Sequence, residues 1–379
     1  MKIRKKNMED ALFYCNSTVS LISSIQIRLT ELMRENADIL ITDDVKGASE
    51  IAARMKRLKL FRKVIYVKGR NFEYKGAGRL KHLAKIIKAN FDDAETKRYI
   101  DLLGNDKRGW DILYFYDYNL FLCALYDLSL SENRSVRCVR FDEGILCYPN
   151  LDKMKGKRIL INEMLRKLRK KSGLLPAIQM YEIFLPEVLK EFVTSARILK
   201  KIEEVKRNGE THRILNELYC FSISQFIFPQ RYIYFSSPYR NDGIEVDDTD
   251  LLNQLAKRLG KENIIVKSHP RDRENKYEKQ GFCIIRDSYI PWEIVQMNKD
   301  FRNKVFLSLT SASIVNAQIM FNETIEAYYL FPCIKTNDLS YISLCKKVSG
   351  VLKVLQSKGI CLKTKIINDI SSIPFYQVS

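Results

Sequence analysis

The chain has 379 residues, 46% of them hydrophobic and 29% charged, which is the composition of a globular protein with one or two domains. This composition excludes low-complexity, collagen-like and disordered chains, and no stretch has the roughly 20 apolar residues of a membrane-spanning helix. A formal charge of +19 implies an acidic partner, which can be nucleic acid, an anionic membrane or a charged substrate.

The chain start and the cysteines indicate where the protein resides. The basic residues 1–6 run into Glu9 and Asp10, where a signal peptide would be apolar. Nine cysteines form no CxxC pair, and most lie in apolar runs, so reduced thiols are expected. We therefore expect a cytoplasmic protein.

Short apolar runs alternate with helical patterns along the first 150 residues. Strands are predicted at 12–15, 38–42, 63–67, 111–116 and 136–141, and helices at 19–35, 48–58, 79–90 and 120–130. This alternation predicts an α/β fold with a parallel sheet covered on both faces, so residues 1–150 are interpreted as a Rossmann-like domain.

Residues 151–228 interrupt the alternation and are predicted to be a mainly helical connecting region without a strand. A second series follows, with strands at 231–235, 263–267, 282–285, 304–309 and 324–329, and helices at 250–259, from 291, from 313 and at 340–356. Residues 229–379 are therefore predicted to form a second parallel-sheet domain, with a ligand cleft between the two. Because such sheets bind ligands at the carboxyl ends of their strands, the loops after the strands are the candidate sites.

Adjacent carboxylates follow the predicted strand 136–141. Asp142-Glu143-Gly144 pairs two acids with the residue that best allows a tight turn. A positioned carboxylate there can act as a general base. In isolation, an ordinary turn with solvated acids is the favoured explanation of the motif.

A histidine between cations follows the strand 263–267. In Lys267-Ser268-His269-Pro270-Arg271 the proline favours an extended His269, and the two cations suit a phosphate. A surface-loop histidine is the alternative. The other two histidines, His82 and His212, are expected on solvated helix faces.

Hydroxyl groups follow the strand 304–309 and open a helix at Ser308-Leu309-Thr310-Ser311-Ala312-Ser313. Hydroxyls and helix-terminal N–H groups can bind an anion, or they can simply cap the helix. Ile290-Pro291-Trp292-Glu293 is a further helix start. No GxGxxG, GxxxxGK[ST], GxSxG or HExxH motif occurs, and Asp248-Thr249-Asp250 is interpreted as a helix N-cap rather than a metal clamp.

Together, Asp142-Glu143-Gly144, the Lys267-x-His269-Pro270 element and Thr310-Ser311 resemble three signature motifs of bacterial sialyltransferases, in the same order. The resemblance is closest to glycosyltransferase family 52, the lipooligosaccharide and capsule sialyltransferases, and more distant to bacterial polysialyltransferases. Residues 12–18 also resemble the first strand and loop of that family, and residues 290–293 its Pro-x-Glu helix start.

The resemblance implies a GT-B architecture, in which two Rossmann-like domains face each other across a cleft. It implies an inverting transfer of sialic acid from CMP-sialic acid to a galactoside-type acceptor of a surface glycan, with no metal or other cofactor. Asp142 is then the base, and His269 stabilises the departing phosphate. The implied donor-binding residues are Lys267, Pro270, Glu293, Thr310, Ser311, Ser313, Ser236 and Ser237, and the implied acceptor-binding residues are Asn16, Ser17, Thr18, Glu143 and Gly144.

The sequence departs from the family at Ser236-Ser237-Pro238, where a Gly-Gln-Pro type of loop is expected. A transferase using another CMP-nonulosonate or a nucleotide-hexose therefore remains an alternative. A nucleic-acid-binding protein is a second alternative, motivated by the charge, but no RRM, KH or helix-turn-helix signature occurs, so no nucleic-acid partner is expected. A degenerate GT-B protein with a structural role is the third.

Residues 153–171 are strongly basic, with nine Lys or Arg side chains. Ile161, Met164, Leu165 and Leu168 fall on one side of the predicted helix, and Arg166, Lys167, Arg169 and Lys170 on the other. Such a helix can lie on the anionic inner face of a membrane, or it can pack its apolar side on the domain. The helical material of residues 151–228 could also support a homodimer.

Overall fold

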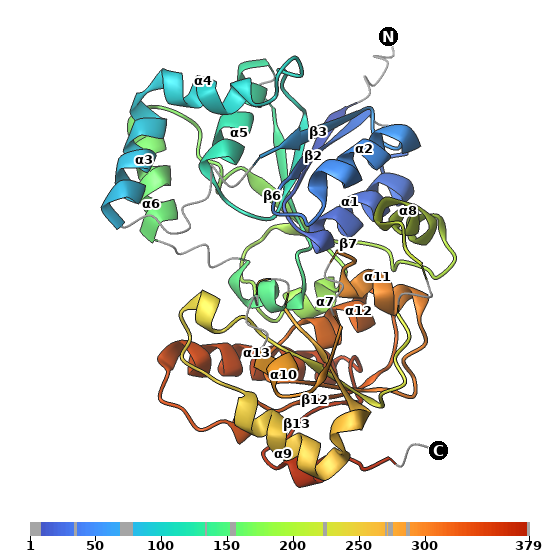
Figure 1. The fold of residues 1–379 in the computed structure, drawn as a ribbon. Coiled ribbons are helices and arrows are strands. Elements are labelled where there is room, and N and C mark those ends of the chain that lie inside the picture. Colours follow the sequence, from blue (N-terminus) through green and yellow to red (C-terminus); the bar gives the residue numbers. More distant parts are fainter. Residues whose placement is uncertain are drawn as a thin grey trace. The chain divides into compact units, whose positions relative to one another are not determined.

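The computed structural model describes residues 9–33, 36–68, 79–132, 135–151, 157–222, 226–269, 271, 276–285 and 289–376, with only the backbone for 79–82. The chain forms two compact units, each with its own parallel sheet (Figure 1). The first unit comprises Met1–Glu143, Asn150–Pro186 and Val193–Glu203, and the second comprises Gly144–Pro149, Glu187–Phe192 and Glu204–Ser379. Each unit is described by itself below.

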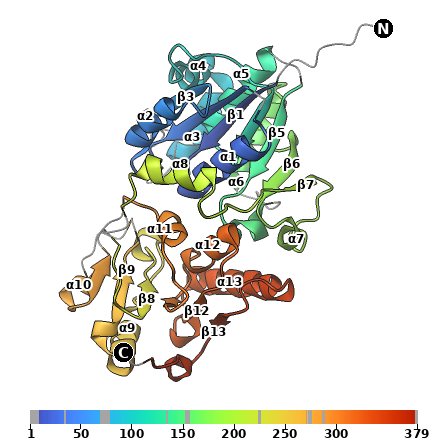
Figure 2. The ribbon, with the colours of Figure 1, turned by 90° about the vertical axis from the view of Figure 1, so that its right-hand side faces the viewer.

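The first unit contains a seven-stranded sheet in the order β3-β2-β1-β4-β5-β6-β7, with every pair parallel. Its strands are β1 (Asp10–Cys15), β2 (Asn36–Thr42), β3 (Lys63–Val67), β4 (Ile112–Phe115), β5 (Arg137–Phe141), β6 (Ile178–Ile183) and β7 (Ile198–Lys201). Its helices are α1 (Thr18–Thr30), α2 (Ala48–Leu58), α3 (Arg79–Phe91), α4 (Asp93–Asp101), α5 (Leu120–Glu132) and α6 (Lys157–Leu168). Helices α1 and α2 cover one face of the sheet, and α3 to α6 lie on the other (Figures 1 and 2).

The central strands form where the sequence has nearly continuous apolar runs, as expected for strands covered on both faces. Residues 11–15 of β1 are all buried, and the Phe13 ring stacks on Tyr114 of β4 with 4.4 Å between ring centroids. The predicted strand at 63–67 and helix at 48–58 are confirmed to the residue. Helix α1 ends at Thr30, five residues before the predicted end.

The prediction of a strandless connecting region over 151–228 is wrong. Strands β6 and β7 arise from this segment and extend the first sheet beyond β5. Their sequences lack a clear apolar run, because β6 contains Gln179 and Glu182, and β7, at the sheet edge, ends in two lysines. Lysine is common on edge strands, where it opposes pairing with other chains.

The second unit contains a six-stranded parallel sheet in the order β10-β9-β8-β11-β12-β13. Its strands are β8 (Tyr232–Phe235), β9 (Ile264–Lys267), β10 (Cys283–Ile285), β11 (Val305–Ser308), β12 (Glu326–Tyr329) and β13 (Thr364–Ile366). The helices are α8 (Glu210–Tyr219), α9 (Thr249–Leu259), α10 (Lys276–Lys279), α11 (Trp292–Asn298), α12 (Ser313–Phe321) and α13 (Leu339–Ser357), and α7 (Pro186–Leu189) lies where the chain passes between units.

Both sheets follow the same doubly wound order. In each sheet, the second and third strands are added in turn on one side of the first strand. The chain then returns, and the fourth strand pairs with the other side of the first strand. The switch points therefore lie between β1 and β4 and between β8 and β11, where such sheets bind their ligands. The predicted α/β class with two Rossmann-like sheets is confirmed.

Helix α6 does not pack on the unit through its apolar side, which is one of the two arrangements that the sequence leaves open. Asn162 and Arg166 are its buried side chains, whereas Met164 and Leu168 of the expected packing side are exposed. The Arg166 guanidinium donates to Asp127 at 2.5 Å and to the Ser172 carbonyl at 2.6 Å. The helix is held by polar contacts, which helical periodicity of apolar residues cannot anticipate. Within the described ranges, no helix is both long and apolar enough to cross a membrane.

Candidate active site at the carboxyl ends of the strands

The loops after β8, β9 and β11 meet at the switch point of the second sheet. The His269 backbone N–H donates to Ser236 Oγ at 2.9 Å, which joins the loops after β9 and β8. Ser308 Oγ donates to the Phe235 carbonyl at 2.9 Å and accepts the N–H of Ser311 at 3.0 Å. Three of the predicted site residues, Ser236, His269 and Ser311, are thus brought together, and Ser308 is the hydroxyl that links them to β8.

Tyr239, in the loop after β8, contacts the loop after β11 through Thr310. Its hydroxyl lies 2.7 Å from Thr310 Oγ1, and both residues are buried. Burial raises the pKa of the Tyr239 phenol, while hydrogen bonds to Thr310 and Ser237 act in the opposite direction. The Tyr239 ring packs edge-on against Tyr341, at 5.6 Å between centroids. The sequence gives no signal for Tyr239, because its role depends on a residue 71 positions away.

His269 is a neutral hydrogen-bond donor in this environment. Burial, followed by the charges of Arg271 and Lys267, lowers the pKa of His269 from 6.5 to about 4. Its Nδ1 accepts the backbone N–H of Arg271 at 3.1 Å, so the ring proton of the neutral form is on Nε2. The imidazole can therefore donate from Nε2 to an anion, and a phosphate beside it would raise the pKa again.

Lys267 and Glu293 are both buried at the same edge, and the charge of Lys267 acts on the Glu293 carboxyl. Lys267 ends β9, is buried, and donates from Nζ to the Ser268 carbonyl at 3.1 Å. Burial raises the pKa of Glu293, and the charge of Lys267 opposes that shift. Trp292, next to Glu293, packs edge-on against Phe235 at 4.9 Å between centroids, which fixes the start of α11. Glu293 is therefore a buried residue in the first turn of α11.

Helix α12 begins directly after the hydroxyl-rich loop. Its N-cap residue is Ala312, which has no side chain to cap the helix, and Ser311 Oγ accepts the Ser313 N–H at 3.3 Å instead. Capping therefore accounts for part of the role of Ser311, but not for Thr310. Ser313 is the first residue of α12 and is half-buried. Pro270, the remaining predicted donor residue, lies outside the described residues.

In the first unit, Asp142 follows β5 and is buried. Its Oδ2 accepts the backbone N–H of Phe184, which follows β6, at 3.0 Å. The Asp142 carbonyl accepts from Ser23 Oγ of α1 at 3.4 Å. These two bonds tie the Asp142 carboxylate to the end of β6 and its backbone to α1.

The two residues after Asp142, Glu143 and Gly144, have different surroundings. Glu143 is half-buried, and its charge adds to the burial that raises the pKa of Cys15 to about 12. Gly144 has φ +106°, and a Cβ at this position would lie 2.9 Å from the Asn316 amide nitrogen. Asn316 of α12 accepts the Ile145 N–H on its Oδ1 at 3.2 Å, within the second unit. Glycine is therefore required here by both conformation and space, and Asn316 is a site-adjacent residue that the sequence analysis missed.

The loop after β1 combines a helix cap with a buried amide. Ser17 Oγ accepts the Ser20 N–H at 3.0 Å, and Ser20 Oγ accepts the Ser17 N–H at 3.0 Å, so the two residues cap α1 reciprocally. Asn16 Oδ1 is buried and accepts no hydrogen bond from the described residues. Capping explains Ser17, while Asn16 and Thr18, the first residue of α1, remain candidates for acceptor binding.

Most of the chain matches the model of one protein family. The model described as alpha-2,8-polysialyltransferase (POLYST) matches residues 11–330. The chain belongs to this family. This match confirms the resemblance to bacterial sialyltransferases. It also confirms the resemblance to polysialyltransferases, which the motifs indicated as more distant than that to glycosyltransferase family 52. Placement in glycosyltransferase family 52 is not confirmed by this match.

Among solved structures, the alpha/beta-galactoside alpha-2,3-sialyltransferase of Photobacterium phosphoreum is 10% identical, covers 96% of this chain and 100% of its own, and has a TM-score of 0.51. The spinosyn rhamnosyltransferase SpnG is 10% identical over 97% of both chains, with a TM-score of 0.48. The UDP-GlcNAc 2-epimerase of Neisseria meningitidis is 11% identical over 95% of both chains, with a TM-score of 0.46. No curated protein sequence matches the chain. The likeness to the Photobacterium enzyme extends over both units and shows a shared fold.

Asp248 has a structural role in this polysialyltransferase-family chain. It precedes α9, as predicted, but its carboxylate does not cap the helix. It accepts from Tyr234 at 2.6 Å, from Tyr277 at 2.8 Å and from Lys276 at 2.7 Å, and it is buried. In the described part of the chain, no three His, Cys, Asp or Glu side chains are grouped as metal ligands.

The expectation that His212 is solvated is wrong. The ring is buried in the second unit, where Nδ1 accepts the Asn208 N–H at 2.8 Å and Nε2 lies 2.8 Å from Asn298 Oδ1. These contacts fix the start of α8 against the end of α11. The side chain of His82 lies outside the described residues.

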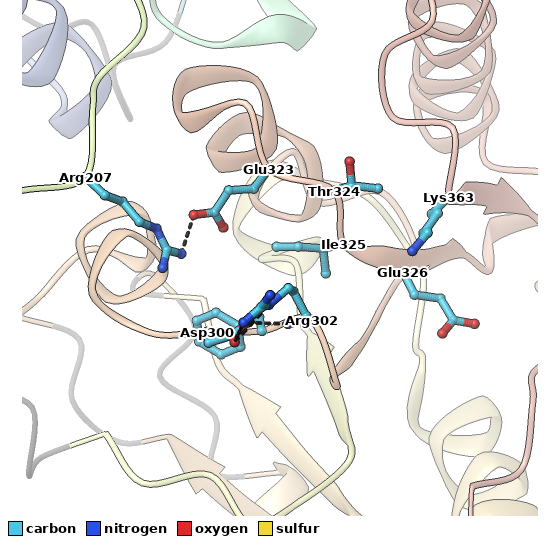
Figure 3. Close-up of a pocket in the computed structure, with 9 residues that line it drawn as sticks. Arg207, Asp300, Arg302, Glu323, Thr324, Ile325, Glu326 and Lys363 are labelled. Atoms are coloured by element: carbon cyan, nitrogen blue, oxygen red, sulfur yellow. Dashed lines mark hydrogen bonds and ion pairs between the residues drawn. The ribbon is translucent and has the colours of Figure 1, made fainter.

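A pocket of about 430 Å³ lies at the amino end of the second sheet (Figure 3). Its lining consists of Arg207, Asp300, Phe301, Arg302, Glu323, Thr324, Ile325, Glu326 and Lys363. Arg207 pairs with Glu323, and Arg302 pairs with Asp300 at 2.6 Å, so charges within the lining neutralise each other. Because it precedes β11 and β12, this pocket is not at the edge where the hydroxyls and His269 gather.

Proposed function

We propose that the protein is an inverting, metal-independent sialyltransferase that uses CMP-sialic acid. The observation that carries this proposal is the meeting of His269, Lys267, Glu293 and the hydroxyls of Ser236, Thr310 and Ser311 at the switch point of the second sheet. Cations, hydroxyls and a neutral N–H donor together suit a phosphate ester at the position where doubly wound sheets bind nucleotides.

The proposed role of the second unit is to stabilise the departing CMP. The transition state of sialyl transfer resembles an oxocarbenium ion, and charge builds up on the leaving phosphate as the bond to the sugar breaks. The Nε2–H of His269 donates to that phosphate, and the buried Lys267 ammonium neutralises part of its charge. Thr310 and Ser311 hold the same phosphate, and Glu293 accepts from the ribose hydroxyls.

Asp142 is the proposed general base in the first unit. Its carboxylate removes the proton from the acceptor hydroxyl while the oxygen attacks the anomeric carbon, so one bond forms as the bond to CMP breaks and the configuration inverts. The N–H bond from Phe184 keeps one carboxylate oxygen in place. Asn16, Thr18 and Glu143 are the proposed contacts to the acceptor.

The family match favours an acceptor that already ends in sialic acid, because its description names alpha-2,8-polysialyltransferases. The galactoside acceptor expected from the motifs is the second candidate. Both belong to surface glycans such as a capsule or a lipooligosaccharide, and both require the same donor and the same base.

The test is incubation of the purified chain with CMP-N-acetylneuraminate and two labelled acceptors, one ending in α2,8-linked sialic acid and one in galactose. We expect CMP release and an elongated acceptor, with an inverted anomeric configuration in the product NMR spectrum. Excess EDTA should leave the rate unchanged. Transfer from a nucleotide-hexose but not from CMP-sialic acid, or strict dependence on Mg²⁺ or Mn²⁺, would refute the proposal.

A further inference from the structure

Two neighbouring helices of the first unit expose large apolar side chains at helical spacing. On α6, Leu160, Met164 and Leu168 are 56% to 68% exposed, and on α3, Leu83, Ile87 and Phe91 are 37% to 50% exposed. Residues four positions apart lie on one face of a helix, so each set forms a stripe. We refer to these six side chains as the apolar stripes.

The stripes belong to helices that pack side by side (Figure 1). Asn90 Nδ2 of α3 donates to Asn162 Oδ1 of α6 at 2.6 Å. Arg169, which follows α6, lies with its guanidinium 5.3 Å from the centre of the Phe91 ring, so the carboxyl-terminal ends of the two stripes are close. The buried side chains Asn162 and Arg166 anchor α6 to the unit. The stripe of α6 is on the opposite side of the helix and faces solvent.

Cations outnumber acidic side chains around the stripes, with Asp92 and Asp93 directly after Phe91 as the nearest acids in sequence to the α3 stripe. Residues 79–91 contain no acidic side chain, and residues 157–171 contain only Glu163. The Glu163 carboxylate accepts from the Tyr118 hydroxyl at 2.6 Å and from the Leu174 N–H at 3.2 Å. The exposed cations on the two helices and directly after α6 include Lys85, Lys157, Arg158, Lys167 and Lys170. Lys88 contributes less, because it lies 3.6 Å from Glu95.

We propose that the apolar stripes and these cations form a docking surface for an anionic lipid bilayer. The stripes enter the boundary between headgroups and acyl chains, and the flanking Lys and Arg side chains contact the lipid phosphates. A second copy of this chain is a poor occupant, because pairing the surface with itself would bring like charges together. The proposal concerns where the protein works and does not depend on the donor or acceptor proposed above.

The residues that carry this surface differ from those expected from the sequence. Replacing Arg166 would break its pair with Asp127 and destabilise the helix, so Arg166 is unsuitable for testing lipid binding. The informative substitutions are Leu160→Ser, Met164→Ser and Leu168→Ser together, and separately Lys85→Gln, Lys157→Gln, Lys167→Gln and Lys170→Gln together. All seven side chains are half-buried or exposed, so both variants should fold, which circular dichroism and thermal melting check.

Binding is measured by sedimentation with vesicles of phosphatidylglycerol and phosphatidylcholine, and with vesicles of phosphatidylcholine alone. The Ser variant should lose about 100-fold in partitioning onto anionic vesicles, since three large apolar groups no longer leave water. The Gln variant should lose about tenfold at low salt on anionic vesicles and nothing on neutral ones.

The matched control replaces three exposed apolar side chains of the second unit, Ile227, Leu339 and Leu362, by Ser. These are 63% to 80% exposed, and their loss should leave vesicle binding unchanged. The proposal is overturned if the unmodified protein binds neither vesicle, if the control loses as much binding as the stripe variant, or if the stripe variant binds as the unmodified protein does. Binding to an acidic protein without vesicle binding would also overturn it.

Discussion

The two sheets have the same strand order but present different chemistry at their carboxyl ends. After β8, β9 and β11 the second unit gathers Ser236, His269 and Thr310 beside Lys267. After β5 the first unit presents the buried carboxylate of Asp142, and after β1 a reciprocal helix cap. The shared topology determines where a ligand can bind, and the side chains of the loops determine which charge is stabilised there.

This difference divides the proposed reaction between the units. A set of hydroxyls and cations stabilises negative charge on a leaving group, whereas a carboxylate accepts a proton from an attacking group. Changes in the second unit should therefore affect CMP binding, while changes at Asp142 should affect turnover alone.

The largest expected effect is that of Asp142→Asn. Asparagine keeps the acceptor for the Phe184 N–H but cannot take up a proton, so the transfer rate should fall by about 10²–10⁴-fold. The affinity for CMP, measured by calorimetry, should stay the same. The comparison is Glu143→Gln, which changes a proposed acceptor contact and should raise the KM for the acceptor with a smaller loss of kcat than Asp142→Asn. A larger loss in Glu143→Gln than in Asp142→Asn would show that the neighbouring carboxylate is the base.

The next effect is that of His269→Gln, with a loss of about 100-fold in transfer rate. Because the pKa of His269 is lowered to about 4, the free protein has a neutral imidazole at pH 7, and a bound phosphate raises that pKa. The imidazole should therefore take up a proton when CMP binds and favour binding as the pH falls from 7 to 5, and glutamine should remove this part of the pH dependence while leaving the part due to the phosphate itself.

Histidine NMR provides the direct measurement, because the chain has three histidines. The His269 signal should titrate at higher pH with CMP than without it. The His212 ring, which is held by Asn208 and Asn298, provides the internal reference signal. If CMP affinity in His269→Gln follows the same pH curve as in the unmodified protein, the histidine does not face the phosphate.

A third prediction concerns Glu182, the buried fifth residue of β6, which pairs in register with Phe141 of β5 and whose Oε1 lies 3.4 Å from Lys200 Nζ. Burial raises its pKa to about 7, above the value near 4.3 of an unfolded chain. The protonated form therefore stabilises the fold at low pH, and this contribution is lost as the pH rises through 7. Glu182→Gln should raise the free energy of unfolding at pH 8 by about 1–3 kcal/mol.

Urea unfolding between pH 5 and 8 is the measurement for Glu182. The unmodified protein should lose stability mainly between pH 5 and 7, because the unfolded carboxyl is already ionised there and the folded one is not, and Glu182→Gln should lose less. The exposed Glu203→Gln is the control and should behave as the unmodified protein does. Equal slopes in all three would mean that the Glu182 carboxylate is already ionised at pH 5.

The smallest expected effect is that of Tyr239→Phe. It removes the hydroxyl 2.7 Å from Thr310 Oγ1 and should weaken CMP binding by about three- to tenfold, the value of one hydrogen bond. Tyr232→Phe removes a comparable buried bond, to the Pro374 carbonyl, at the amino end of the same sheet. CMP affinity should be unaffected there, and equal losses in both variants would indicate general destabilisation instead of a positioning role.

Much of the candidate site could be predicted because it lies next to strongly patterned strands. Cys138, Val139 and Phe141 in β5 and residues 264–266 in β9 give each segment a strand pattern, so the position of Asp142 and His269 after a strand follows from local sequence. The partners Tyr239, Ser308 and Asn316 were missed or left without a role. Each is defined by a contact with a residue distant in sequence, such as Thr310, Phe235 or Ile145.

The sequence by itself determined the α/β class, most strands and helices, and the loops in which chemistry can occur. Apolar runs and turn residues act over a few positions, so they can be recognised without the fold. Only the tertiary structure decided that β6 and β7 join the first sheet, that α6 packs through Asn162 and Arg166, and that His269 is neutral. These properties depend on contacts between residues that are distant in sequence and on how far each group is buried from water. The local sequence pattern carries no information on either.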